Sequence, residues 1–166
     1  MMATNNIIRM LESKKIEFTL FELPPEKIGA LETAQILSID PAIVFKSIVV
    51  VREQPVKPIL AIIPGPCTVD LKKLAKAVNE KKLRIPTQQS AEQITGLQAG
   101  GISPLALLNQ GFQFFIDEKA LDHDQIYISA GQRGLNIRIS VKDLIHLINA
   151  RVINITSSPK NSEDVI

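Results

Sequence analysis

Residues 42–51 read Ala-Ile-Val-Phe-Lys-Ser-Ile-Val-Val-Val and decide the fold, because the β-branched run predicts a strand buried on both faces. Side chains alternate across a strand, so Lys46 shares one face with Val44, Ile48 and Val50. An ammonium group on an apolar face is costly unless it has a partner or reaches water. Either the lysine stem lies on the core and its head reaches solvent, or Lys46 serves a function.

Other strand and helix patterns surround this stretch. Residues 59–63 predict a hairpin partner for it, and residues 126–130 and 135–139 predict a second hairpin. Further strands are expected over residues 16–23, 83–85, 112–116 and 151–155. Helices are expected over residues 5–15, 32–37, 71–78 and 90–95 and after residue 140, with Thr4, Asp70, Ser90 and Ser140 as N-caps. The order predicts an α/β (α+β) fold: a mixed, mostly antiparallel sheet with helices packed around it.

The composition is that of one globular domain. The chain has 166 residues, of which 45% are hydrophobic and 22% charged, and we expect a single domain over residues 1–155 and a loose tail over residues 156–166. A net charge of +2 neither indicates nor excludes nucleic-acid binding, whereas 4% aromatic residues argue against a stacking platform for several bases. One cysteine and no apolar run of membrane-spanning length favour a cytoplasmic protein with no membrane contact.

Common catalytic and metal-binding patterns are missing from the sequence. His123 and His146 are the only histidines, and neither has a second ligand at a familiar spacing, so we expect neither a metal site nor a cofactor. Cys67 follows Pro-Gly-Pro and is interpreted as a small hydrophobic residue. No nucleophile elbow and no phosphate-binding loop ending in Gly-Lys-Ser or Gly-Lys-Thr occurs.

Two glycine segments remain as candidates for chemistry. One is Gly100-Gly101-Ile102-Ser103-Pro104 and the other is Ser129-Ala130-Gly131-Gln132-Arg133-Gly134. Each is either a tight turn or a loop whose backbone N–H groups line up on an anionic or carbonyl oxygen. Together with a lysine on a buried strand, the two loops could bind an oxyanion and a phosphate.

These segments, with Phe45-Lys46-Ser47, resemble in order and spacing the YbaK/EbsC family of trans-editing deacylases and prolyl-tRNA synthetase insertion domains. The resemblance implies hydrolysis of the ester on the 3′ terminal adenosine of a mischarged aminoacyl-tRNA, by water or by the substrate's own thiol. It implies that Lys46 holds the terminal nucleotide and acts as a catalytic residue with Gly101 and Ser129. The substrate-binding residues that it implies are Ser47, Gly100, Ile102, Ser103, Pro104, Gly131 and Arg133.

The resemblance extends to a substrate and a partner. The sequence is most similar to the branch of the family that hydrolyses Cys-tRNA(Pro). Two alternative functions remain: hydrolysis of Ala-tRNA(Pro), or a non-catalytic module that binds nucleotides or tRNA ends. Prolyl-tRNA synthetase is an expected docking partner. Phe21 and Leu23 stand where this branch tends to have histidine and tyrosine, and they could line the pocket. Asn136 replaces an aspartate, Ala106 a glycine and Ser47 a threonine.

Overall fold

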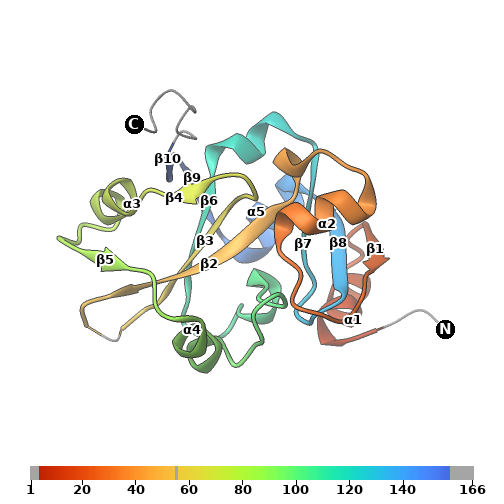
Figure 1. Cartoon of the computed structure of the whole chain (residues 1–166), viewed down its shortest axis with the longest axis horizontal. Helices are drawn as coiled ribbons and strands as arrows, with labels where there is room; N and C mark the ends of the chain where they lie inside the picture. The colour runs from red at the N-terminus through yellow and green to blue at the C-terminus, as the bar shows by residue number, and fades with distance from the viewer. Residues whose placement is uncertain (1–3, 55, 158–166) are drawn as a thin grey trace.

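The computed structural model describes residues 4–54 and 56–157, and its centre is a five-stranded sheet in the order β5-β2-β3-β6-β9 (Figure 1). Strand β2 is antiparallel to both β3 and β5, whereas β3, β6 and β9 are parallel to one another. The sheet is therefore mixed, as predicted. Its strands are β2 (Phe45–Arg52), β3 (Ile59–Pro64), β5 (Leu83–Arg84), β6 (Gln113–Asp117) and β9 (Arg151–Ile153).

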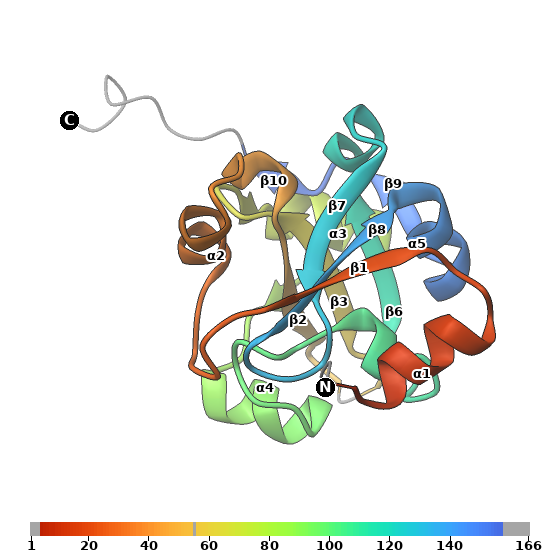
Figure 2. The same ribbon diagram turned by 90° about the vertical axis from the view of Figure 1, so that its right-hand side faces the viewer.

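A second, antiparallel sheet crosses in front of the first when the molecule is turned by 90° (Figure 2). It consists of β1 (Phe18–Glu22), β8 (Leu135–Ser140) and β7 (Gln125–Ser129), with β8 in the middle. A single bridge between Val44 and Tyr127 connects the start of the β2 segment to β7. This contact brings the Lys46 end of β2 next to the second sheet.

The helices cover both sheets. α1 (Asn6–Ser13) and α5 (Val141–Ile148) pack on the main core, and α3 (Leu71–Ala77) packs on the opposite face of the central sheet. Within the described residues no helix is long and apolar enough to cross a membrane. The other helices are α2 (Ala30–Leu37) and α4 (Gln88–Thr95), with 3₁₀ turns η1 (Pro41–Ile43), η2 (Pro104–Ala106) and η3 (Glu118–Asp122).

Strand β2 contributes to two cores because its side chains alternate, as the sequence predicted. Phe45 and Val49 lie in the main core between the two sheets, α1 and α5. Val50 is buried in the second core, under α3, and Ile48 packs against it. Lys46 therefore belongs to the face that α3 covers.

Two of the predicted N-caps were wrong. Asn5, not Thr4, caps α1, and its side chain accepts a hydrogen bond from the Ile8 N–H at 3.0 Å. Helix α4 begins one turn earlier than predicted, because the Thr87 hydroxyl accepts from the Ser90 N–H at 3.2 Å and so takes the capping role. The predicted caps Asp70 of α3 and Ser140 of α5 are confirmed.

The predicted start of the loose tail, at residue 156, was too early in the sequence. Thr156 and Ser157 form β10, which pairs with β4 (Thr68–Val69), and Thr156 is buried. The sequence here is short and polar, so periodicity gives no strand signal. Residues 158–166 of the expected tail lie outside the described residues.

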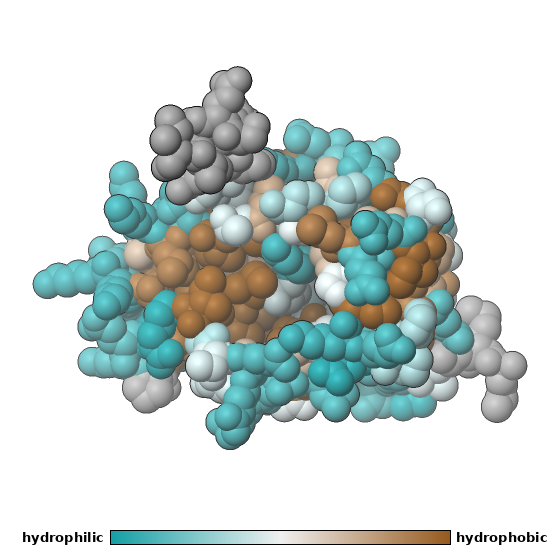
Figure 3. Space-filling view, viewed as in Figure 1, coloured by the Kyte–Doolittle hydropathy of each residue, from teal (hydrophilic) through white to brown (hydrophobic). Residues whose placement is uncertain are grey.

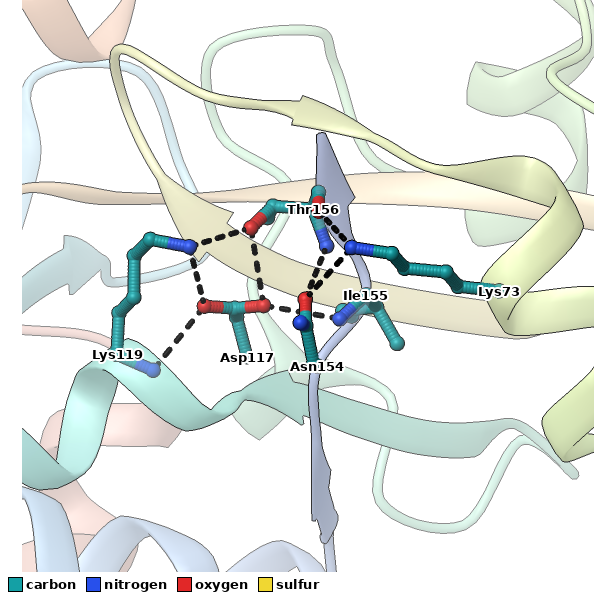
Figure 4. Close-up of polar contacts among 6 residues, drawn as sticks. All are labelled: Lys73, Asp117, Lys119, Asn154, Ile155 and Thr156. Carbon is teal, nitrogen blue, oxygen red and sulfur yellow. Dashed lines mark hydrogen bonds and ion pairs between the residues drawn. The ribbon is translucent and has the colours of Figure 1, made fainter. Parts of the chain in front are cut away.

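A buried carboxylate fixes the end of the described chain. Asp117 is fully buried and accepts hydrogen bonds from the Ile155 N–H at 3.0 Å and the Thr156 hydroxyl at 3.2 Å (Figure 4). It also accepts from the Lys119 N–H at 3.0 Å, and the Lys119 ammonium lies 3.6 Å from its second oxygen. The carboxylate thus ties the end of β6 to the segment that follows β9.

Candidate active site

A cavity of about 280 Å³ opens at the start of β2. Its walls come from the β1–α2 connection, the first turns of α2, residues 44–47, the loop at residues 99–102, and the adjoining ends of β7 and β8. The polar residues in the lining are Lys27, Thr33, Lys46, Ser47, Ser129 and Asn136. Segments distant in the sequence therefore converge on Lys46; we call this cavity the cleft.

Lys46 is held at the edge of the cleft by the turn after β3. Its Nζ donates to the Gly65 carbonyl oxygen at 2.8 Å. Gly65 is itself fixed, because its N–H donates to the Val44 carbonyl at 2.7 Å and a Cβ would lie 2.8 Å from the Ala30 Cβ. Burial lowers the pKa of the Lys46 ammonium, and the charge interaction with Cys67 opposes that shift.

The structure brings five of the predicted site residues together. Lys46, Ser47, Gly100, Ile102 and Ser129 all line the cleft. They come from β2, from the loop before η2 and from the end of β7. The first glycine segment therefore reaches the cleft through Gly100 and Ile102.

Gly101 instead joins the two glycine segments. A Cβ on Gly101 would lie 2.9 Å from two backbone atoms of Gln132, so the two loops are in direct backbone contact. Arg133 adds a second connection, because its Nε donates to the Ala99 carbonyl at 2.7 Å. In this structure Gly101 and Arg133 position the cleft wall and are not part of its lining.

The remaining predicted residues are also outside the cleft lining. Ser103 is buried and its hydroxyl accepts from the Leu105 N–H at 3.2 Å, with Pro104 as the first residue of η2. Gly131 has φ +94°, and a Cβ there would lie 2.5 Å from Cδ1 of Ile7 in α1. These residues shape the loops, and their side chains or Cα atoms are not in the lining.

The sequence did not indicate that the β1–α2 connection lines the cleft, and it wrongly suggested that Phe21 and Leu23 could do so. Lys27 lines the cleft and its ammonium hydrogen-bonds to Oε1 of Gln88 in α4, a contact that no motif indicated. Phe21 and Leu23 do not line it. Phe21 packs on Tyr127 with ring centroids 5.3 Å apart, and Leu23 is buried.

The contact between the two loops predicts a large effect of Gly101→Ala on stability. The added methyl group meets backbone, which cannot rotate away, so we expect the free energy of unfolding to fall by about 2 kcal/mol. Gly29→Ala is the control, because nothing lies within 4 Å of a Cβ at Gly29. Urea unfolding of both variants measures the difference, and equal stabilities would contradict the proposed backbone contact.

The cleft suits an anionic ligand better than a cationic one. Two ammonium groups, Lys27 and Lys46, are in its lining, and the described residues that form the lining include no carboxylate, histidine or cysteine. Across residues 4–54 and 56–157 no group of three His, Cys, Asp or Glu side chains could hold a metal ion. Such a site can bind a phosphate and position an already activated bond such as an ester, for which a side-chain nucleophile is not required.

Comparisons with known proteins agree with this geometry. The model of the aminoacyl-tRNA editing domain matches residues 25–147, which contain every residue of the cleft. The protein EbsC of Enterococcus faecalis, provisionally assigned as a Cys-tRNA(Pro)/Cys-tRNA(Cys) deacylase, is 33% identical over 154 residues, covering 92% of this chain and 93% of EbsC.

Solved structures share the fold. A hypothetical protein superposes with a TM-score of 0.84 at 17% identity, covering 92% of this chain and all of that one. A protein provisionally assigned as a trans-editing enzyme for prolyl-tRNA synthetase gives a TM-score of 0.75 at 24% identity, covering 94% of this chain and all of that one. The family match, the relative and the shared fold together establish that this chain belongs to the aminoacyl-tRNA editing domain family, the YbaK/EbsC family.

Proposed function

We propose that this protein hydrolyses the ester bond of mischarged aminoacyl-tRNA and that Cys-tRNA(Pro) is its main substrate. The observation that carries the proposal is the position of Lys46 at the edge of a cleft with two ammonium groups and no carboxylate. The similarity to EbsC over nearly its whole length supports the choice of a cysteinyl substrate.

In this proposal the 3′ terminal adenosine occupies the cleft. The ammonium of Lys46 binds its phosphate or ribose, and Lys27, which also lines the cleft, adds a second positive charge. Ser47, Ser129 and the backbone at Gly100 surround the aminoacyl group. The cleft lining offers no side chain of the usual general-base type, so water positioned by the pocket or the thiol of the cysteinyl substrate attacks the carbonyl carbon.

Attack forms a tetrahedral intermediate, which collapses when the C–O bond to the ribose breaks. With water as nucleophile, the products are the free amino acid and tRNA bearing a ribose hydroxyl. With the substrate thiol, the first product is a cyclic thioester, which water then opens to free cysteine. In both routes hydrogen-bond donors that fit the developing oxyanion lower the barrier.

A parallel assay with Cys-tRNA(Pro), Ala-tRNA(Pro) and Pro-tRNA(Pro) tests the proposal. We expect the rate of amino acid release to be highest for cysteine and near the uncatalysed rate for proline. Preferential release of alanine would assign the protein to alanyl editing. Binding of all three without release would leave a non-catalytic module that holds tRNA ends.

The assay is run with and without prolyl-tRNA synthetase, because a small cleft contacts only the end of the tRNA. We expect the synthetase to raise the rate by presenting the tRNA end. A rate that is independent of the synthetase would show that the protein acts alone.

A further inference from the structure

Positive charge is concentrated in one short part of the chain. Residues 70–84 contain six Lys or Arg side chains and two carboxylates, a net charge of +4, whereas the whole chain carries +2. The remainder of the chain is therefore net negative, at −2. This segment forms α3, the connection after it and β5, which pack against each other at one side of the molecule (Figure 1).

We call this region the basic lobe and define it by five exposed cationic side chains. With other described residues, none of the five makes an ion pair or a side-chain hydrogen bond. Of the two carboxylates in the segment, Glu80 pairs with Arg52 at 3.2 Å, and Asp70 caps α3 by accepting from the Lys72 and Lys73 N–H groups. The positive charge of the lobe is therefore left available to a partner. The five residues are Lys72, Lys76, Lys81, Lys82 and Arg84.

Strand β2 connects the lobe to the cleft. The cleft lies at residues 44–47 of the β2 segment, and β5 pairs with Val51 and Arg52 at its other end. From Lys46 to Val51 the strand rises about 17 Å. The cleft and the lobe therefore lie at opposite ends of β2.

An apolar slot lies along β2 between the cleft and the lobe. This second cavity, of about 160 Å³, shares Ser47, Ala99 and Ile102 with the cleft. It follows the part of β2 that β5 does not pair, and it reaches Ile85, which is 52% exposed and directly follows Arg84 of the lobe. In the view of Figure 3, hydrophobic side chains form one group in the left half and a second group at the right, with hydrophilic side chains along much of the outer border.

We propose that the basic lobe binds the backbone phosphates of an RNA double helix whose single-stranded 3′ end runs through the apolar slot into the cleft. The proposal rests on the proposed function for the identity of the RNA. Unpaired cations fit a row of phosphates, and an apolar slot fits the face of an unstacked base. The continuity of cleft, slot and lobe along β2 favours RNA over an acidic protein, for which no comparable connection to the cleft is needed.

The test uses an uncharged RNA hairpin with an acceptor-stem duplex and a single-stranded CCA end, so that binding is measured without catalysis. The lobe variant carries Lys72→Gln, Lys76→Gln and Lys82→Gln. The control variant carries Lys14→Gln, Lys15→Gln and Lys142→Gln, which remove the same charge from exposed positions outside the lobe. Fluorescence anisotropy at several salt concentrations gives the affinity and its salt dependence for each protein.

We expect the lobe variant to bind the hairpin about tenfold more weakly at low salt, with a salt slope shallower by about 2 to 3, because each phosphate contact contributes about 0.9. The control variant should stay within about twofold of the unmodified protein. A single-stranded CCA oligonucleotide should bind the lobe variant and the unmodified protein equally. Equal hairpin affinity and slope for the two triple variants would overturn the inference.

Two further measurements separate this inference from its alternatives. If the unmodified protein hydrolyses none of the three aminoacyl-tRNAs but hairpin binding still depends on the lobe, the proposed function fails and the inference stands. If ester hydrolysis is observed but the lobe variant binds the hairpin as the unmodified protein does, the proposed function stands and the inference about the lobe fails. Loss of prolyl-tRNA synthetase binding by a lobe variant that retains normal hairpin binding would assign the lobe to a protein partner and overturn the inference.

Discussion

Lys46→Ala is expected to lower the rate of aminoacyl-tRNA hydrolysis by about a hundredfold or more while the protein remains folded. The lysine brings its charge to the edge of the cleft, where a hydrogen bond to the Gly65 carbonyl holds it. Removing a partly buried ammonium relieves a desolvation cost, so the melting temperature should be unchanged or slightly higher. Single-turnover hydrolysis and thermal unfolding measure the two effects separately.

Two more variants separate the charge from the packing of the side chain. Lys46→Met keeps the length of the stem and should be as inactive as alanine. Lys46→Arg should also fail, because a planar guanidinium does not replace a compact ammonium at a position fixed by one carbonyl. Lys142→Ala, at an exposed position in α5, is the matched control. Near-normal hydrolysis by Lys46→Ala would mean that the lysine only covers the core with its stem.

Asp117→Ala is expected to produce a large loss of stability, about 3 kcal/mol in the free energy of unfolding. The change leaves the Ile155 N–H and the Thr156 hydroxyl without their buried acceptor (Figure 4). It also removes the acceptor of the Lys119 N–H and the ion-pair partner of the Lys119 ammonium, which keeps its hydrogen bond to the Thr156 hydroxyl. Urea unfolding gives the energy, and amide hydrogen exchange at Ile155 shows whether the loss begins at this segment.

Two comparisons refine that experiment. Asp117→Asn has nearly the same shape but only one acceptor oxygen, so it should lose less than alanine does. Asp122→Ala, at an exposed position at the end of η3, should change stability by less than about 0.5 kcal/mol. If Asp117→Ala were no worse than Asp122→Ala, the carboxylate would not be what holds the chain end.

The parts of the fold that the sequence predicted are those with strong periodicity. The buried runs of β2 and β3 and the hairpin of β7 and β8 are confirmed, as is the helix that Ser140 caps. In each, the apolar pattern agrees with the local start or turn signal. The parallel pairing of β6 with β3 could not be predicted, because it depends on tertiary packing and not on any local turn.

The cleft was predictable only in part, and for a physical reason. Lys46 and the loop at residues 100–102 were indicated by residue types that are unusual in their setting. Lys27 and Gly65 gave no signal, because an exposed lysine and a glycine between prolines are common in any loop. Their roles come from tertiary contacts that the sequence does not reveal: Gly65 lies against Ala30 of α2, and Lys27 contacts Gln88 of α4.

The net charge of the whole chain concealed the local concentration of positive charge. A net charge of +2 over the chain gave no indication of nucleic-acid binding, although residues 70–84 alone carry +4. Only the structure places these cations on one lobe and connects them to the cleft through β2. Charge counted over shorter windows of sequence would have found the segment but not its neighbours in space.

The pairing of β1 with β8 has a consequence for how the protein is made. Phe18 pairs with Ile139 and Glu22 with Leu135, so the first strand finds its partner only near the end of the chain. The side chain of Asn5 likewise donates to the carbonyl of Ala130 at 2.8 Å. During synthesis α1 and β1 therefore emerge from the ribosome long before β8 and Ala130 are made. Such non-local closure is slow, and the nascent chain is expected to need protection from aggregation until β8 has been translated.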